Sequence, residues 1–416
     1  MSKIIITGGK QLKGTVTISG AKNAILPIIA ASLLSAEPVL LDDAPDLLDV
    51  SVMGRVVESL GAKIKREGSQ LRIHADQINV IEAPHELVSQ MRASTYIMGA
   101  VLARKGHVRI SHPGGCTIGS RPINLHLKGL EALGAEVSMD HGFLNVTAKS
   151  LRGASIYLDF PSVGATENIM MTAALAKGTT ILQNAAQEPE IVDLANFLNE
   201  MGGKIRGAGT SVIHIEGVRE MHGTRHAIIP DRIEAGSYLL MAAAAGGDVL
   251  VRNVITAHLE SLLAKMEEAG IKFVEEDEGI RVTGDGIYQA VDVKTQVHPG
   301  FPTDLQAPFL ALLCTARGSA ILTETVFENR FMHVDELIRM GAQIKIEGRS
   351  ALIRGVERLT GAPVKATDLR AGAALILAAL AAEGTTEITG VHHIDRGYEK
   401  IVEKLAGLGA QITRKD

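Results

Sequence analysis

A glycine-rich segment at residues 111–122 combines the residue types that bind and activate an anionic substrate. It contains Cys116 among several glycines and ends at Arg121 and Pro122. Glycines let the backbone approach an anion closely, and a guanidinium can donate two parallel hydrogen bonds to a phosphate or carboxylate. Cationic surroundings also lower the pKa of a thiol and make it reactive. We therefore interpret Cys116 as a candidate reactive thiol, with a small core residue as the alternative, whereas Cys314 lies in an apolar run and is interpreted as core.

A second group of candidate residues shares one position in a repeated pattern. Counted back from the end of each of six apolar, helix-like runs, this position holds Lys22, Arg92, Gly164, Arg232, Asp304 and Arg370. A cation is electrostatically unfavourable at a helix N-terminus, whereas the free N–H groups there bind anions. We expect three helix starts in each domain to converge and, with Lys22, Arg92 and Arg370, to receive a polyanionic ligand. Solvated helix starts are the alternative.

The elements that position these residues recur six times. A glycine that ends an amphipathic helix and precedes a strand returns at intervals of about 70 residues, which indicates an internal repeat. These glycines are Gly61, Gly134, Gly202, Gly270, Gly341 and Gly409. Each repeat also contains a helix that is apolar on all faces and short β-branched strands. The predicted fold class is α/β, with six repeated units in two domains and buried helices walled by sheets.

Composition and charge narrow the class of protein. The chain has 416 residues, of which 46% are hydrophobic and 21% charged, as in a folded protein of two or three domains. Its net charge of −5 provides no basic field for nucleic acid or an anionic membrane. Two cysteines make no disulfide framework, the N-terminal apolar run is too short for a signal peptide, and residues 371–382 are too short for a membrane helix. We therefore expect a soluble, cytoplasmic protein.

Several common chemistries have no motif in this sequence. It has no GxxxxGK[ST] loop, no GxGxxG motif after a strand, no HExxH motif and no CxxC pair. His392 and His393 are adjacent but lack further ligands at suitable spacing, so we interpret them as a polar loop pair rather than a metal site.

Eight segments spread along the chain resemble the enolpyruvyl transferases. They are residues 19–24, 113–122, 161–166, 188–193, 230–236, 301–304, 327–331 and 393–398. Jointly they are specific for family members that act on UDP-N-acetylglucosamine. The resemblance implies transfer of the enolpyruvyl group of phosphoenolpyruvate to the sugar 3-hydroxyl through a tetrahedral intermediate, with release of phosphate. This reaction is the first committed step of peptidoglycan precursor synthesis.

The resemblance also implies a two-domain inverted barrel that closes over the ligands. Chain order alone would divide the sequence near residues 229–231, but in the family the N-terminal strand crosses to the second domain. The first domain would then be residues 20–229, with three repeats and the Cys116 loop. The second would be residues 1–19 plus 230–416, with three repeats and Asp304.

The resemblance assigns roles to residues of this sequence. Cys116 would protonate the methylene carbon of phosphoenolpyruvate and can form a covalent adduct with it, and Asp304 would accept the proton of the 3-hydroxyl. The phosphoenolpyruvate site would comprise Lys22, Asn23, Arg121, Arg370 and Arg396, of which Lys22 and Arg396 also count as catalytic. The UDP-N-acetylglucosamine site would comprise Arg92, Arg121, Pro122, Ile123, Asn124, Leu125, Ser162, Val163, Gly164, Asp304 and Val326.

The sequence leaves three alternative kinds of protein to be considered. A shikimate-pathway enolpyruvyl transferase shares the fold but has no catalytic cysteine in a PGGC loop. A ring-forming, clamp-like scaffold would need basic inward helices, whereas these are apolar. A UDP-N-acetylglucosamine-binding paralogue without turnover is opposed by the presence of Cys116, Asp304, Lys22 and Arg396.

One position departs from part of the family. Phe160 stands two residues before Ser162, where some members carry a lysine, which argues against an ionic diphosphate contact there. The resemblance implies no cofactor, no metal and no nucleic-acid or membrane partner. We expect a monomer that fosfomycin inactivates at Cys116.

Overall fold

The computed structural model describes residues 2–111 and 123–415, which divide into two compact units. Among these residues, the first unit comprises residues 20–111 and 123–229, and the second comprises residues 2–19 and 230–415. Each unit contains three β-sheets within the described part of the chain. Each sheet with its helices corresponds to one repeat of the sequence.

The first unit combines these three sheets with two kinds of helix. Its strands are β3 (Val39–Asp42), β4 (Lys63–Glu67), β5 (Gln70–His74), β6 (His107–Ser111), β7 (Glu136–Asp140), β8 (Phe143–Thr147), β9 (Ser155–Tyr157), β10 (Thr179–Gln183), β11 (Lys204–Arg206), β12 (Val212–Glu216) and β13 (Arg225–Ala227). Its apolar helices are α1 (Lys22–Ala31), α4 (Ile97–Lys105) and α6 (Val163–Ala173). Its other helices are α2 (Leu48–Ser59), α3 (His85–Val88), α5 (Asn124–Ala132) and α7 (Pro189–Glu200).

The second unit is built in the same way. Its strands are β1 (Lys3–Thr7), β2 (Leu12–Thr17), β14 (Gly247–Arg252), β15 (Lys272–Glu276), β16 (Gly279–Gly284), β17 (Val293–Lys294), β18 (Ser319–Thr323), β19 (Gln343–Glu347), β20 (Ser350–Arg354), β21 (Pro363–Lys365), β22 (Thr385–Thr389) and β23 (Gln411–Lys415). Its apolar helices are α8 (Arg232–Ala245), α10 (Gln306–Leu313) and α12 (Leu369–Ala381). Its amphipathic helices are α9 (Glu260–Glu268), α11 (Val334–Arg339) and α13 (Ile401–Gly407).

Five of the sheets share one strand pattern, which confirms the predicted repeat. In the order β9-β10-β12-β11, the first two strands are parallel and the following pairs are antiparallel. The sheets β13-β3-β5-β4, β2-β14-β16-β15, β17-β18-β20-β19 and β21-β22-β1-β23 repeat this pattern. The sheet β6-β8-β7 has three strands, and an isolated parallel bridge between Glu82 and Arg109 stands where the fourth strand would lie.

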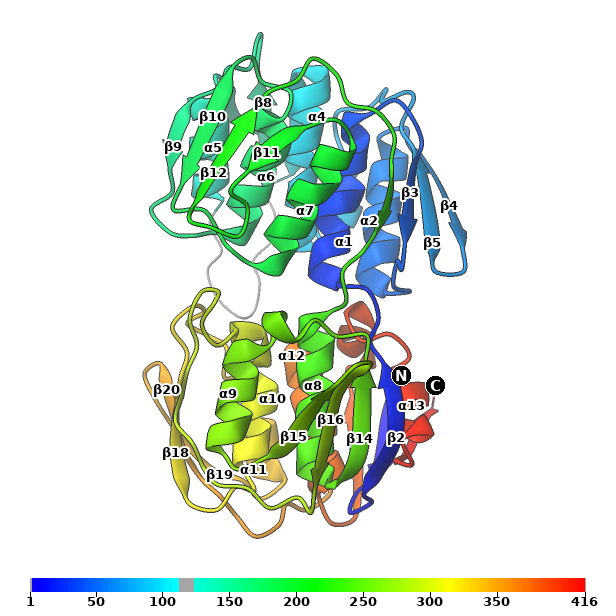
Figure 1. The fold of residues 1–416 in the computed structure, drawn as a ribbon, viewed down its shortest axis with the longest axis vertical. Helices are drawn as coiled ribbons and strands as arrows, with labels where there is room; N and C mark the ends of the chain where they lie inside the picture. The colour runs from blue at the N-terminus through cyan, green and yellow to red at the C-terminus, as the bar shows by residue number, and fades with distance from the viewer. Residues whose placement is uncertain (1, 112–122, 416) are drawn as a thin grey trace. The chain divides into compact units, whose positions relative to one another are not determined.

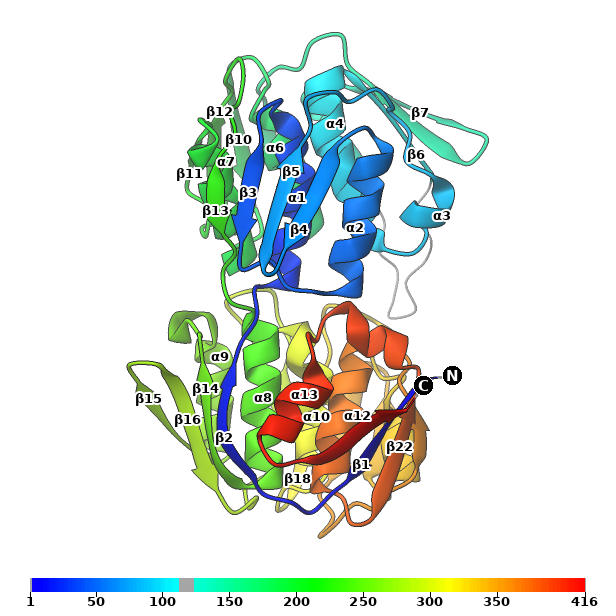
Figure 2. The ribbon, with the colours of Figure 1, turned by 90° about the vertical axis from the view of Figure 1, so that its right-hand side faces the viewer.

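The N-terminal strand completes the last repeat. β1 pairs antiparallel with both β22 and β23, so that Ile4 lies opposite Ile388 and Arg414. It thereby takes the place that β12 holds between β10 and β11. β2 continues into the next sheet of the same unit and pairs parallel with β14. Figure 2 shows both strands in blue, with β1 beside the C-terminal strand β22 and β2 beside β14, in green.

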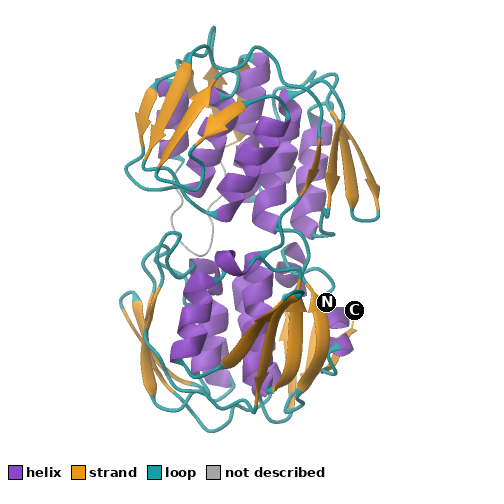
Figure 3. Cartoon of the chain, in the orientation of Figure 1, coloured by secondary structure: helices purple, strands orange, loops and turns teal. Residues whose placement is uncertain are grey.

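The apolar helices form the cores. Within the second unit α8, α10 and α12 contact one another, and the sheets lie on the outside of the helices (Figures 1 and 3). Leu375, Ile376 and Leu377 of α12 are at most 1% exposed, so this helix is buried on every side. Each such side chain contributes about 1.5–3 kcal/mol on burial, which explains how a core with few aromatic residues is stable.

The six repeat glycines end their helices as expected. All have positive φ, from +75° at Gly270 to +112° at Gly61, a conformation that is accessible at little cost only to glycine. None of the helices in the described part of the chain is long and apolar enough to span a membrane.

Candidate active site

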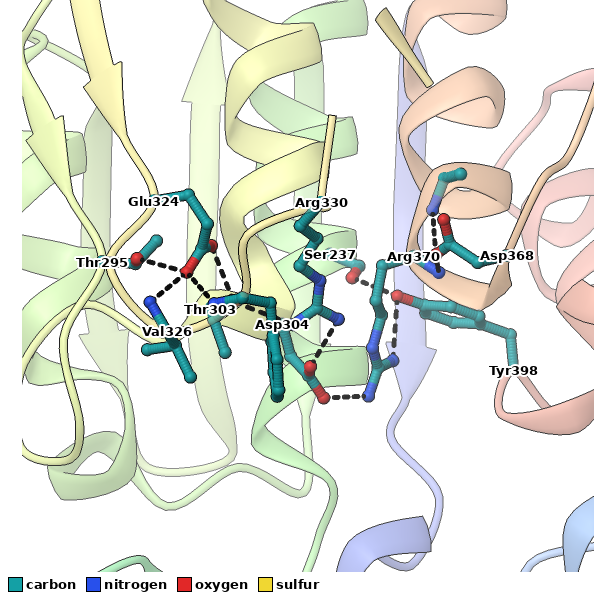
Figure 4. Close-up of polar contacts among 12 residues, drawn as sticks. Ser237, Thr295, Thr303, Asp304, Glu324, Val326, Arg330, Asp368, Arg370 and Tyr398 are labelled. Atoms are coloured by element: carbon teal, nitrogen blue, oxygen red, sulfur yellow. Dashed lines mark hydrogen bonds and ion pairs between the residues drawn. The ribbon is translucent and has the colours of Figure 1, made fainter. Parts of the chain in front are cut away.

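Asp304 is held between two arginines of the second unit. It lies in a short 3-10 helix, η4 (Thr303–Leu305), directly before α10. Its Oδ1 accepts a 2.7 Å hydrogen bond from Arg330 Nη2, and its Oδ2 accepts a 2.8 Å hydrogen bond from Arg370 Nη2 (Figure 4). Burial by itself would raise the pKa of Asp304, but the two guanidinium groups outweigh burial and hold this pKa well below its usual value. The side chain is therefore a charged, oriented carboxylate.

Arg370 is fixed from its other side by a hydroxyl pair. Its Nη1 donates a 3.3 Å hydrogen bond to the Tyr398 hydroxyl, which lies 2.8 Å from Ser237 Oγ (Figure 4). Ser237 Oγ donates its single proton to the Ile233 carbonyl at 2.8 Å. The Tyr398 hydroxyl must therefore donate its own proton to Ser237 Oγ and accept the hydrogen bond from Arg370 Nη1. This chain of bonds aims the Arg370 guanidinium at Asp304.

The three apolar-helix starts of the second unit lie close together. Asp231 caps α8, Asp304 precedes α10, and Arg370 is the second residue of α12. Burial would lower the pKa of Arg370, but the negative charges of Asp304 and Asp231 help to raise it, so the guanidinium stays charged although it is 3% exposed. The predicted convergence of helix starts is confirmed in this unit.

Glu324 is a buried carboxylate that follows β18 and accepts four hydrogen bonds. Its Oε1 accepts from Thr295 Oγ1 at 2.9 Å, from the backbone N–H of Val326 at 2.7 Å and from that of Phe327 at 3.1 Å. Its Oε2 accepts from Thr303 Oγ1 at 2.7 Å (Figure 4). Glu324 thus holds Val326, a predicted contact of the nucleotide sugar, together with the residue before Asp304.

Arg330 connects Asp304 to Glu324 by way of Thr303. Its Nη1 donates to Thr303 Oγ1 at 2.8 Å while its Nη2 donates to Asp304. The side chain is 5% exposed. Arg330, Thr303 and Glu324 were not predicted as site residues, and the only available signal was that Thr303 and Arg330 lie in two of the family-like segments.

Lys22 begins α1 in the first unit and is paired with a buried carboxylate. Its Nζ lies 2.9 Å from Asp49 Oδ2 of α2, and the Asp49 side chain is only 3% exposed. Asn23 follows as the second residue of α1 and is half-buried. Asp49 was not predicted as a site residue. It orients the ammonium group at a helix start, where N–H groups also point outward.

Six of the predicted nucleotide-sugar residues of the first unit lie at two helix starts that pack together. Ile123 precedes α5, Asn124 and Leu125 begin it, Ser162 caps α6, and Val163 and Gly164 are the first residues of α6. Ser162 Oγ accepts a 3.4 Å hydrogen bond from the Ala165 backbone N–H. A Cβ atom at Gly164 would lie 3.1 Å from His126 Cε1, so glycine lets the two helices approach closely. Helix starts of this kind favour an anionic group.

The structure places the remaining predicted site residues only in part, or not at all. Arg396 ends η5 (Val391–Arg396), and Arg92 begins η2 (Arg92–Tyr96), although the Arg92 side chain is outside the description. Cys116, Arg121 and Pro122 lie outside the described residues. Among residues 2–111 and 123–415, no group of three or more His, Cys, Asp or Glu side chains is arranged to hold a metal ion.

Comparisons with known proteins first define the class of the fold. The family model "EPSP synthase (3-phosphoshikimate 1-carboxyvinyltransferase)" matches residues 6–405. The solved structure of the enolpyruvyl transferase NikO from Streptomyces tendae has a TM-score of 0.90 at 25% identity and covers 100% of this chain and 99% of that one. EPSP synthase from Acinetobacter baumannii has a TM-score of 0.76 at 17% identity over 100% of both chains, which shows the fold alone.

Curated relatives are much more similar in sequence. UDP-N-acetylglucosamine 1-carboxyvinyltransferase 1 of Caldanaerobacter subterraneus subsp. tengcongensis is 59% identical over 100% of both chains. UDP-N-acetylglucosamine 1-carboxyvinyltransferase 2 of Carboxydothermus hydrogenoformans is 58% identical over 100% of this chain and 99% of its own. The chain therefore belongs to the EPSP synthase family of carboxyvinyltransferases and, within it, to the UDP-N-acetylglucosamine 1-carboxyvinyltransferases. The family resemblance and the fold class predicted from the sequence are confirmed.

Proposed function

We propose that the chain transfers the enolpyruvyl group of phosphoenolpyruvate to the 3-hydroxyl of UDP-N-acetylglucosamine and releases phosphate, as the first committed step of peptidoglycan precursor synthesis. The observation that carries this proposal is 59% identity, over the whole chain, to a UDP-N-acetylglucosamine 1-carboxyvinyltransferase. In the addition step the sugar oxygen bonds to C2 of phosphoenolpyruvate while C3 gains a proton. In the elimination step the bond to phosphate breaks and C3 loses a proton, which restores the double bond.

Asp304 is the proposed base for the sugar hydroxyl. A hydroxyl is a weak nucleophile, so a positioned carboxylate must accept its proton. In the described arrangement two guanidinium groups weaken Asp304 as a base. If Arg370 turns toward the anionic phosphoenolpyruvate, Asp304 loses one positive neighbour and becomes a stronger base. The same movement would couple phosphoenolpyruvate binding to activation of the hydroxyl.

Cations and helix starts are proposed to stabilise the negative charge that accumulates. Lys22, Arg121 and Arg396 would bind the phosphate and carboxylate, with Arg370 in support and Asn23 at the tetrahedral intermediate. Donors that are oriented before the reaction stabilise such a transition state without further reorganisation. The nucleotide sugar would bind at the starts of α5 and α6, where Asn124 and Ser162 lie.

Cys116 is the proposed acid that protonates the methylene carbon, and it can also form a covalent adduct. The proposal includes a cytoplasmic, monomeric enzyme without a metal or cofactor. Size-exclusion chromatography with light scattering tests the monomer.

The deciding experiment measures phosphate release from phosphoenolpyruvate with and without UDP-N-acetylglucosamine for the wild type, Cys116→Ala and Cys314→Ala. Cys314 is the matched control because it is fully buried and burial raises its pKa to about 12. Release that requires the sugar, collapses in Cys116→Ala and survives in Cys314→Ala supports the reaction and the role of the thiol. Release that survives in Cys116→Ala removes the thiol from the mechanism.

Two further outcomes address the alternatives. Release that depends on shikimate 3-phosphate instead of the nucleotide sugar would indicate the shikimate-pathway reaction. Binding of UDP-N-acetylglucosamine without any phosphate release would indicate a paralogue that only binds.

A further inference from the structure

We propose that Glu324, Thr303 and Arg330 form a positioning relay for Asp304. In this relay Glu324 anchors Thr303, Thr303 anchors Arg330, and Arg330 orients the Asp304 carboxylate. The inference rests on the proposed function, because Asp304 acts as a base only in that reaction. None of the three relay residues is assigned to a substrate site, and the hydrogen bonds that join them lead to Asp304.

Glu324 is a rigid anchor. It is 0% exposed, and both of its carboxylate oxygens accept hydrogen bonds from the protein. A buried carboxylate is costly unless donors compensate it, so the groups around Glu324 are held in one arrangement. Thr303 is one of those groups, and its hydroxyl has a single proton that it donates to Glu324 Oε2.

The orientation of the Thr303 hydroxyl decides where Arg330 lies. With its proton on Glu324, Thr303 Oγ1 can only accept, and it accepts from Arg330 Nη1 at 2.8 Å. Arg330 Nε is buried and has no hydrogen-bond partner among the described residues. Loss of the Thr303 hydroxyl would leave a second buried donor of the guanidinium unsatisfied, which favours rotation of the guanidinium away from Asp304.

The relay has a second branch toward the nucleotide sugar. Glu324 Oε1 also accepts from the backbone N–H groups of Val326 and Phe327. A change at Glu324 should therefore disturb both the predicted sugar contact at Val326 and the orientation of Asp304. A change at Thr303 should disturb Asp304 alone.

The test compares Thr303→Val, which removes the hydroxyl, with Thr303→Ser, which keeps it. Phosphate release that depends on UDP-N-acetylglucosamine is measured from the lowest pH at which the wild type stays folded up to pH 9, with both substrates varied. We expect Thr303→Val to lower kcat by about tenfold or more, because small displacements of a reacting group slow catalysis strongly. The acid limb of its pH profile should move to higher pH, because Arg330 is one of the charges that lower the pKa of Asp304. The KM for the nucleotide sugar should stay within about twofold, and Thr303→Ser should behave like the wild type.

Two more variants complete the design. Glu324→Gln should show the same loss of kcat and should also raise the KM for UDP-N-acetylglucosamine. Arg330→Lys should move the acid limb as Thr303→Val does, since one ammonium does not reproduce the fork between Thr303 and Asp304. Thermal unfolding of each variant identifies any that fails to fold. The kcat values and pH profiles of the variants that fold then test the relay.

Several results would overturn the relay. These are Thr303→Val or Arg330→Lys with wild-type kcat and an unmoved acid limb, or equal losses in Thr303→Val and Thr303→Ser. A wild type without sugar-dependent phosphate release would instead contradict the proposed function.

Discussion

Arg370 and Asp304 form a 2.8 Å ion pair that joins the start of α12 to the turn before α10. The family resemblance assigns the two residues to different substrates, Arg370 to phosphoenolpyruvate and Asp304 to the nucleotide sugar. In the structure the two side chains are paired within the second compact unit, so the charge of each one affects the pKa of the other. Any ligand that attracts Arg370 therefore changes the basicity of Asp304.

Asp304→Asn removes the proposed base and leaves two buried guanidinium groups without their counter-charge. We expect phosphate release to fall by about 10²–10⁴-fold. The free energy of unfolding should fall by about 3 kcal/mol, because Arg330 and Arg370 are 5% and 3% exposed. Enzyme assays and thermal unfolding measure the two effects. Glu216→Gln, in an exposed pair with Lys204, is the control and should change neither.

Tyr398→Phe removes the hydroxyl that supports Arg370. Because the structure places this hydroxyl 3.3 Å from Arg370 Nη1, we expect the KM for phosphoenolpyruvate to rise by about three- to tenfold, with a smaller change in kcat. Steady-state kinetics at fixed nucleotide sugar measure this effect. Tyr157→Phe, at an exposed position, should leave both constants unchanged. Equal effects of the two substitutions would contradict the role of Tyr398.

Glu234→Gln should alter the pH dependence of stability. Glu234 is 2% exposed and accepts hydrogen bonds from Lys404 Nζ and the Ser19 backbone N–H. Burial raises the pKa of Glu234 from 4.5 to about 7, although Lys404 opposes this shift. Between these pH values the folded chain binds a proton that the unfolded chain has released, so this group makes the protein less stable as pH rises.

The stability difference between Glu234→Gln and the wild type isolates that contribution. We expect the difference to shift in favour of the variant between pH 4.5 and pH 8, by at most about 3 kcal/mol. Urea denaturation at several pH values measures it. A difference that does not change with pH would refute the assignment.

His226→Gln should destabilise the protein more at low pH than at high pH. His226 Nε2 lies 3.0 Å from Asp193 Oδ1, and Nδ1 lies 2.8 Å from Glu200 Oε2. Burial would lower the pKa of His226, but the two carboxylates outweigh burial and raise this pKa above 6.5. The resulting stabilisation is fully present below pH 6.5 and is lost as pH rises through the raised pKa. Melting temperatures at pH 6 and pH 9 test this, with exposed His214→Gln as the control.

Much of the fold could be predicted because its signals are local. The glycine that ends each amphipathic helix has a backbone conformation that depends on its own residue type, as Gly61 and Gly270 show. The apolar helices are buried on all sides, as their composition predicts. The family and its reaction class were also recognised correctly from the sequence. Cys116, Arg121 and Pro122 stay predictions, because they lie outside the described residues.

Other features were decided only by the tertiary structure. The sequence determined the repeat, the buried helices and the charged helix starts, since each depends on residues close together in the chain. It did not determine that Glu324, Thr303 and Arg330 would meet at Asp304, nor that β1 would pair with β22 and β23. A buried carboxylate finds its donors, and β1 finds its two partner strands, only when distant segments pack around a common core. The partner of each such group is therefore selected by the whole fold and not by its neighbours in sequence.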